Sequence, residues 1–347
     1  MDTLYGQSLE QLRSTVGRLE LPRFAAAQLS AWLYKKHVVD IDAMTDISLS
    51  GRERLKSECS VGLSAAEHVS ESVDGTKKYL FRTASGRFVE SAFIPDGQRA
   101  TLCISSQAGC RMGCAFCATG RGGWHGNLTA AEILNQIESL PERDRLTNVV
   151  LMGMGEPLDN ADEMLRALEV MTSSWGYAWS PTRVTLSTVG VVPELKRFIE
   201  STDVNLAVSL HNPVSAERAA IMPVERAYPI AEVVDLIKKY DFTHQRRVSF
   251  EYIVLKGMND TPDHVKAIAR LLDGLKCRIN LIRFHTIPDS PFVSPDSPFV
   301  SPDALTMTRF RDALSRKGII TTIRASRGED IEAACGLLSA EHRNESL

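Results

Sequence analysis

The sequence predicts an α/β fold in which a parallel sheet is open or rolled into a barrel. This prediction rests on the alternation of apolar, strand-like runs with helical segments after residue 128. The expected strands are 148–152, 183–188, 205–210, 248–255, 278–284 and 319–323. The expected helices lie near 129–139, 161–172, 193–200, 230–240, 262–272 and 304–317. A capping box, Thr129-Ala-Ala-Glu132, marks the start of the first of these helices.

Two further parts precede this alternation. Residues 1–75 are expected to form a small, polar, helical accessory domain, with an amphipathic helix around Trp32. Residues 76–95 are expected to form a β-hairpin that extends the barrel, because the strand-like runs 78–83 and 88–94 flank a Ser-Gly turn.

The composition indicates a globular protein of a reducing compartment. The chain has 347 residues, 44% of them apolar, and a formal net charge of −3. Its seven cysteines are clustered rather than spread, which favours metal-binding or catalytic thiols over a secreted disulfide framework. The start has no basic segment ahead of an apolar run, and no stretch approaches the roughly 18–20 apolar residues of a membrane span. We therefore expect a cytoplasmic protein with no membrane partner.

Local charge patterning favours a nucleic-acid partner more than the net charge does. Residues 99–129 include Arg99, Arg111 and Arg121 and no acidic residue, and residues 305–328 are strongly basic as well. Such patches can neutralise phosphates. Ordinary solvated helix faces would show the same pattern, so charge alone leaves both interpretations open.

Three closely spaced cysteines, Cys110, Cys114 and Cys117, form the most informative motif. Three thiolates can hold three irons of a 4Fe–4S cluster and leave the fourth iron open, whereas closed clusters take four cysteines. The spacing of three and then two residues, with Phe116 before the last cysteine, is typical of radical S-adenosylmethionine (SAM) enzymes. A partial zinc site is the alternative, and His125 is the nearby candidate for its fourth ligand.

Polar motifs at successive strand ends indicate a site for one SAM molecule. Glu156 follows the expected strand 148–152, Ser187 ends the next strand, and His211 follows the third. Asn280 lies in the strand 278–284. Since the carboxyl ends of parallel strands meet at one edge of a sheet, we expect these side chains to converge.

Three other residues and one repeat remain open on local evidence. Glu90 shares a strand face with apolar neighbours and is either an edge residue or a carboxylate placed for chemistry. Cys103 and Cys335 are either buried small hydrophobes, the commonest fate of a free cysteine, or functional thiols. The tandem Asp-Ser-Pro-Phe-Val-Ser-Pro repeat at 289–302 is expected to be a duplicated surface loop without chemistry.

Taken together, the ordered motifs resemble the RlmN family of RNA methyltransferases. The matching segments are 101–117, 153–157, 186–190, 209–211, 279–282 and 330–336. The resemblance implies a partial (β/α)6 radical SAM barrel over 96–328 and a C-terminal segment, 329–347, that carries a methyl-bearing cysteine. It also implies methylation of carbon 2 of adenine in 23S rRNA and in tRNA next to the anticodon.

The resemblance further implies a role for each candidate site residue. The three motif cysteines would hold one 4Fe–4S cluster, and two SAM molecules would be used per turnover. Cys335 would carry the methyl group, Cys103 would resolve the RNA adduct through a transient disulfide with Cys335, and Glu90 would accept the ring proton. The implied SAM contacts are Gly155, Glu156, Ser187, Ser209, Leu210, His211 and Asn280.

Partners and rival functions follow from the same resemblance. The expected partners are 23S rRNA, tRNA and an electron-donor protein such as a flavodoxin, and the chain is expected to be monomeric. The nearest rival is the related carbon-8 rRNA methyltransferase of the antibiotic-resistance type, in which a cysteine stands where Ala108 stands here. A rival from another class is a zinc-stabilised RNA-binding protein without catalysis.

Overall fold

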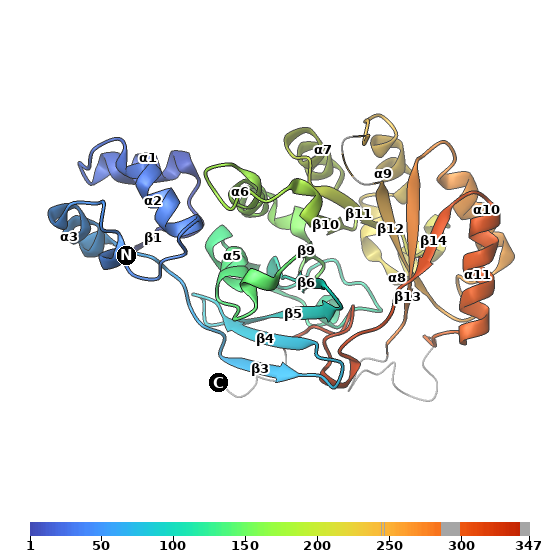
Figure 1. Ribbon diagram of the computed structural model, residues 1–347. Coiled ribbons are helices and arrows are strands. Elements are labelled where there is room, and N and C mark those ends of the chain that lie inside the picture. Colours follow the sequence, from blue (N-terminus) through green and yellow to red (C-terminus); the bar gives the residue numbers. More distant parts are fainter. Residues whose placement is uncertain (244, 246, 286–298, 341–347) are drawn as a thin grey trace.

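We analysed a computed structural model of the chain, which describes residues 1–243, 245, 247–285 and 299–340. A curved sheet forms its centre, with helices around the outer side of the curve and the segment after β14 crossing the inner side (Figure 1). The strands are β1 Asp2–Thr3, β2 Cys59–Ser60, β3 His68–Glu71, β4 Lys77–Arg82, β5 Phe88–Asp96, β6 Arg99–Cys103, β7 Gln107–Gly109, β8 Trp124–Asn127, β9 Asn148–Leu151, β10 Val184–Thr188, β11 Asn205–Ser209, β12 Val248–Val254, β13 Cys277–Arg283 and β14 Ile320–Ile323. The helices are α1 Leu9–Arg18, α2 Ala25–Tyr34, α3 Leu49–Glu58, α4 Ala118–Arg121, α5 Ala130–Glu138, α6 Ala161–Thr172, α7 Val192–Ser201, α8 Ser215–Ile221, α9 Ile230–Ile237, α10 Pro262–Leu271 and α11 Ala304–Arg316.

The main sheet confirms the predicted α/β class. Within the described residues it has ten strands in the order β14-β13-β12-β11-β10-β9-β6-β5-β4-β3. The strands from β6 through β14 in this order are parallel, and β3, β4 and β5 add an antiparallel extension to β6. Every residue of β12 is buried, as expected for a parallel strand covered on both faces.

The boundaries of the predicted elements differ little from those observed, but some short elements were not predicted. The strand β3, at His68–Glu71, lies inside the 1–75 range that was expected to be helical, and it forms the exposed edge of the sheet. Its four residues lack an apolar alternation, so no strand signal is visible there. The hairpin of β7 and β8, which flanks the cysteine motif, is also too short to show an alternation of apolar and polar residues.

A buried polar cluster attaches the N-terminal helices to the barrel. Tyr5 donates from its hydroxyl to the Glu138 carboxylate at 3.1 Å, and the His37 ring pairs with the same carboxylate at 3.1 Å. The Arg143 guanidinium forms an ion pair with the Glu138 carboxylate at 2.5 Å. Since Glu138 belongs to α5, these contacts fix the accessory helices against the barrel's first outer helix.

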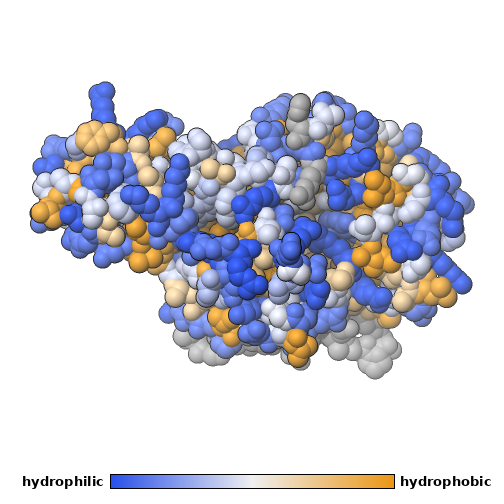
Figure 2. Space-filling view, in the orientation of Figure 1, coloured by the Kyte–Doolittle hydropathy of each residue, from blue (hydrophilic) through white to orange (hydrophobic). Residues whose placement is uncertain are grey.

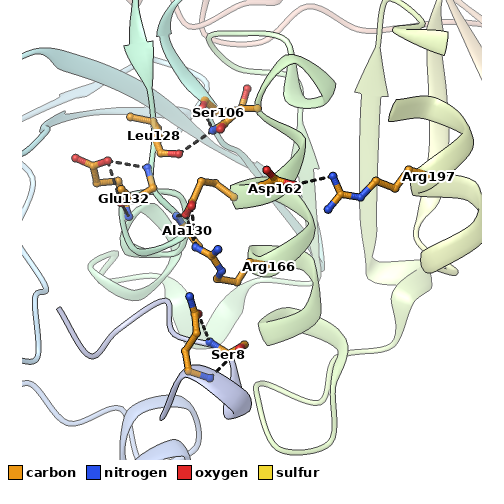
Figure 3. A network of polar contacts seen from close by, with 12 residues as sticks. Ser8, Ser106, Leu128, Ala130, Glu132, Asp162, Arg166 and Arg197 are labelled. Carbon is orange, nitrogen blue, oxygen red and sulfur yellow. Dashed lines mark hydrogen bonds and ion pairs between the residues drawn. The ribbon is translucent and has the colours of Figure 1, made fainter. Parts of the chain in front are cut away.

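The outer helices are joined to one another and to the loop that precedes the cysteine motif (Figure 3). Asn160 donates to the carbonyls of Ser106 and Leu128, at 2.9 and 2.7 Å. Asp162 of α6 pairs with Arg197 of α7 at 2.6 Å. The predicted capping box of Thr129 is present at the start of α5. These bonds hold the two ends of the β7–β8 region in place.

The surface is largely polar on the face seen in Figure 2, where hydrophobic patches are small and separate. Among the described residues, none of the helices is both long enough and apolar enough to cross a membrane. Residues 289–298 of the tandem repeat lie outside the described residues, so the prediction of a surface loop there stays untested.

Candidate active site

The cysteine motif occupies a loop between β7 and α4. The Cys110 amide donates to the Gly123 carbonyl at 2.7 Å, which closes the loop against β8. A Cβ atom on Gly109 would lie 2.0 Å from the same carbonyl oxygen, so the loop can form only with glycine there. Cys110, Cys114 and Cys117 line one cavity, which we call the cluster cavity.

The donor set of this cavity fits an iron–sulfur cluster. Among the described residues, no three His, Cys, Asp or Glu side chains gather around one point as a single metal ion would require. A 4Fe–4S cluster makes a different demand, because each thiolate binds a different iron. Burial raises the pKa of the Cys110 thiol to about 12, so iron rather than solvent pH must displace its proton. His125, the candidate fourth zinc ligand, lies exposed on β8 and is absent from the cavity wall.

Most of the predicted SAM residues converge on the cluster cavity. Gly155, Glu156, Ser187, Ser209 and His211 all line it, from the ends of three neighbouring parallel strands. Two residues do not reach it directly. The Leu210 side chain is fully buried in the core and does not line the cavity. Asn280 stands behind the wall and bonds to a carboxylate that does line the cavity.

Glu156 is held firmly by its neighbours. Its carboxylate accepts hydrogen bonds from the Thr188 hydroxyl at 2.6 Å and from the Val189 and Leu158 amides at 2.9 and 3.0 Å. Burial raises the pKa of Glu156 to about 7 in spite of these donors. A carboxylate offers about four acceptor positions, so one remains for a ligand ammonium.

His211 is locked in its neutral form. Its Nδ1 accepts a hydrogen bond from the Ile253 amide at 3.0 Å, so the proton resides on Nε2. Burial, with a smaller contribution from Arg218, lowers the pKa of His211 to about 3. The ring packs edge-on against Phe116 of the cysteine motif, with centroids 4.7 Å apart.

A second cavity of about 360 Å³ adjoins the first and contains both remaining candidate cysteines. Cys103 and Cys335 line this relay cavity, and Cys117, Met152 and Cys335 belong to the walls of both cavities. Cys103 is 8% exposed, and burial raises the pKa of its thiol to about 12. The structure thus brings together two thiols that are 232 positions apart in the sequence, where Cys103 ends β6 and Cys335 lies in the C-terminal segment.

Glu90 is buried and does not line the relay cavity. The residue is 7% exposed, and its carboxylate pairs with the Lys78 ammonium at 3.2 Å. The backbone amides of Ser339 and Ala340 donate to its Oε2 at 3.0 and 3.4 Å. In this conformation the C-terminal segment therefore hydrogen-bonds to the Glu90 carboxylate and covers it.

Sequence reasoning missed several polar residues of the site. Lys78 faces Glu90 diagonally across the β4–β5 pair, which the hairpin register would have indicated. Arg324 was counted with a basic surface stretch, yet it lines the relay cavity together with Cys335. Glu251 lines the cluster cavity and carries no motif signal of its own.

Comparison with known proteins supplies the family. The model of the ribosomal RNA large subunit methyltransferase N-terminal domain matches residues 3–61, and the radical SAM superfamily model matches residues 104–272. A Bacteroides thetaiotaomicron protein named "Probable dual-specificity RNA methyltransferase RlmN" is 57% identical over 343 residues, covering 99% of this chain and 97% of that one. The chain belongs to the RlmN family.

Other members of the RlmN family and a solved structure agree with this assignment. A Marinobacter nauticus dual-specificity RNA methyltransferase RlmN is 42% identical, covering 96% of this chain and 92% of that one. The crystal structure of a radical SAM methyltransferase from Sphaerobacter thermophilus superposes with a TM-score of 0.89 at 38% identity, covering 98% of this chain and all of that one. Membership of the radical SAM superfamily implies a 4Fe–4S cluster and SAM as cofactors. It also disfavours the zinc-stabilised, non-catalytic alternative.

Proposed function

We propose that this RlmN-family chain methylates carbon 2 of adenine in 23S rRNA and in tRNA next to the anticodon. The observation that carries the proposal is the adjacency of the two cavities. A pair of cysteines, Cys103 and Cys335, lines a cavity that shares a wall with the one lined by the cluster motif. A methyltransferase that passes its methyl group through a protein thiol needs this arrangement.

The cluster cavity would hold both cofactors. Cys110, Cys114 and Cys117 would bind the cluster, and the predicted SAM residues would hold SAM over its open iron, with Glu156 accepting from the SAM ammonium. When bound, the cluster and SAM supply a 5′-deoxyadenosyl radical. His211 and Phe116 close one side of the cavity with packed aromatic surface, which excludes water from the reacting atoms.

Two thiols would share the transfer, because one thiol cannot both carry the methyl group and release it. The Cys335 thiolate would accept a methyl group from the sulfonium of SAM, with S-adenosylhomocysteine as the leaving group. The 5′-deoxyadenosyl radical would remove a hydrogen atom from this methyl group, and the resulting carbon radical would add to carbon 2 of adenine, after which the adduct gives up one electron and the ring proton. Cys103 would then attack the sulfur of Cys335, so that an S–S bond forms as the C–S bond breaks and the released carbon takes up a proton to become the methyl group. An external dithiol reductant must then reduce this disulfide before the next turnover. Arg324 lies beside both sulfurs and would favour their thiolate forms.

Glu90 would remove the proton from carbon 2 of the ring. Its carboxylate is now bound by the amides of Ser339 and Ala340, so these residues would have to withdraw when RNA enters. Lys78, 3.2 Å away, would remain as the ion-pair partner of the carboxylate.

The remaining expectations about partners belong to the same proposal. RNA would contact the basic residues around the relay cavity, which include Arg99, Arg283 and Arg327 in its wall. We also propose an electron donor such as a flavodoxin, a monomeric state, a cytoplasmic location, and the division into 1–75, 76–95, 96–328 and 329–347 given above.

The test is an anaerobic methylation assay with an rRNA fragment and tRNA, followed by mass spectrometric mapping of the methylated carbon. We expect 2-methyladenine from wild type, no product from C335A, and a covalent RNA–protein adduct from C103A. C277A removes a buried cysteine outside both cavities and should methylate normally. A product of 8-methyladenine would refute the carbon-2 assignment, and zinc in place of about four irons per chain would refute the radical mechanism.

A further inference from the structure

The exposed side of the β7–β8 hairpin has no role in the scheme above. This hairpin forms a two-stranded sheet of its own, separate from the main sheet. Trp124 of β8 is 43% exposed, and the guanidinium carbon of Arg111 lies over its ring, 4.3 Å from the centroid. Neither residue lines the cluster cavity or the relay cavity. Tryptophan and arginine are among the side chains that contribute most to binding at protein interfaces, so this pair suggests an interaction surface.

Both side chains are held in place although they are exposed. The Trp124 indole N–H donates to Asn127 Oδ1 at 3.3 Å. The Arg111 guanidinium forms an ion pair with Asp159 at 2.9 Å, which neutralises that carboxylate. Gln107 joins the two contacts, because its amide nitrogen donates to Asn127 at 2.8 Å and to Asp159 at 2.7 Å. A surface whose side chains are already ordered loses little conformational entropy when a partner binds.

The same surface lies directly against the cysteine motif. Gly123, the residue before Trp124, accepts a hydrogen bond from the Cys110 amide at 2.7 Å. Trp124 is paired in register with Gly109, and Arg111 follows Cys110 in the chain. The surface is therefore joined to the first cluster cysteine by one hydrogen bond and a few covalent bonds. Since electron transfer slows steeply with distance, a partner bound here would be well placed to reduce the cluster.

The two cavities are assigned to other molecules. In the proposed function SAM would fill the cluster cavity, and the adenine of RNA would enter the relay cavity. An electron must reach the cluster in each turnover while SAM is bound. An electron donor on the β7–β8 side would compete with neither substrate.

The charge of this region specifies the kind of donor. Residues 99–129 contain no acidic residue. The 3-10 turn Pro223–Arg226 ends in the exposed Arg226. This turn packs on the cysteine motif, since a Cβ atom on Gly113 would lie 3.8 Å from the Pro223 ring. An acidic protein therefore complements this surface. The exposed indole of Trp124 additionally offers an apolar ring to the dimethylbenzene edge of a flavin.

We propose that Arg111, Trp124 and Arg226 form a donor surface, which binds an acidic flavin-bearing protein that reduces the cluster. One electron passes to the oxidised cluster from the anionic flavin hydroquinone, which becomes the neutral semiquinone. No proton is transferred, and no bond forms or breaks. This inference rests on the proposed function only for the need of an electron donor.

The test first measures binding, without SAM or RNA. Cluster-loaded protein is titrated calorimetrically under anaerobic conditions with a purified acidic flavodoxin. W124A should weaken this binding about tenfold or more. R226E should weaken it at low salt and have a smaller effect at high salt, because salt screens exposed charges. R226K keeps the charge, and F24A removes an exposed aromatic ring at the start of α2, so both should bind as wild type does.

A second measurement separates docking from damage to the cluster loop. SAM cleavage to 5′-deoxyadenosine is followed with subsaturating reduced flavodoxin and, in parallel, with dithionite. W124A should be about tenfold slower than wild type with flavodoxin. With dithionite the two proteins should be equal, since a small reductant needs no docking surface. Iron content and circular dichroism establish that each variant is loaded and folded.

Three results would overturn the inference. The first is a wild type that does not bind flavodoxin, or W124A and R226E proteins that bind it as tightly as wild type. The second is a W124A protein that is equally slow with dithionite, since Trp124 would then support the cluster loop. The third is a W124A protein that loses affinity for an rRNA fragment and keeps its affinity for flavodoxin, which would assign the surface to RNA. Absence of 2-methyladenine counts against the proposed function and not against the donor surface, because flavodoxin binding and SAM cleavage are measured without RNA.

Discussion

Arg218 connects the ends of two strands that border the cluster cavity, and its removal gives the most demanding test of the structure. The side chain is 0% exposed and lies in α8. It donates to the carbonyls of Ser209 and Leu210 at 2.8 and 3.0 Å and to that of Val189 at 3.3 Å. It also forms a buried ion pair with Glu225. We consider the substitution R218M, which keeps most of the apolar stem and removes the guanidinium.

The magnitude follows from what the substitution leaves behind. Breaking a buried ion pair from one side leaves an uncompensated charge and costs about 3–5 kcal/mol. The Glu225 carboxylate would keep only the Ile230 amide at 2.9 Å as a donor. R218M should therefore lower the free energy of unfolding by about 3–5 kcal/mol. The double variant R218M/E225M removes the orphaned charge and should recover about 2 kcal/mol or more of this loss.

The assay is urea unfolding of the metal-free protein at 25 °C, followed by circular dichroism. The exposed pair of Lys266 and Asp263 provides the control, and K266M should leave stability within error of wild type because exposed ion pairs contribute little. A double variant as unstable as R218M would show that the orphaned carboxylate is not the main cost, and the reasoning would fail. So would an R218M protein as stable as wild type.

Three further outcomes are expected. His211 stays neutral in the fold at a pKa of about 3 but takes up a proton near pH 6.5 when unfolded, so its contribution to stability is present above that pH and is lost as the pH falls, by roughly 3–5 kcal/mol in total. H211N, whose Oδ1 can replace Nδ1 as acceptor, should flatten stability between pH 6.5 and 4, and an unchanged slope in urea unfolding would contradict this. K78M should slow RNA methylation about tenfold, because Glu90 loses a cation 3.2 Å away, whereas K78R should retain most of the rate. Equal rates for wild type and K78M would exclude a role of Lys78 in supporting Glu90. D330A removes the acceptor of the Ser72 hydroxyl and should speed alkylation of Cys335 by iodoacetamide, measured by mass spectrometry, whereas an unaltered rate would show that this contact does not restrain the C-terminal segment.

Much of the fold could be predicted because the parallel strands carry strong patterns. The buried run of β12 and the alternation in β10 each identify a strand without any tertiary information. Glu156 and Ser187 could be placed together because the ends of parallel strands meet at one edge of a sheet.

The rest depends on the path of segments that have no periodicity. Nothing local in the sequence indicates that Asp330 bonds to Ser72, or that Arg324 turns into a cavity rather than outward. Similarly, nothing in the sequence distinguishes Glu251 from other strand residues. Only the structure shows that its Oε2 is buried without a hydrogen-bond partner among the described residues.

Contacts on both sides of Cys335 hold the C-terminal segment and set the local concentration of the Cys335 thiol. At one end Asp330 is held by Ser72 of the β3–β4 turn, and at the other Thr119 donates to the Leu338 carbonyl. A loop fixed at both ends confines its middle to a small volume, so in the proposed reaction Cys335 would meet Cys103 as an intramolecular partner at a high effective concentration. The same confinement keeps solvent thiols at a disadvantage. The disulfide proposed between Cys103 and Cys335 would therefore form in preference to mixed disulfides with small thiols.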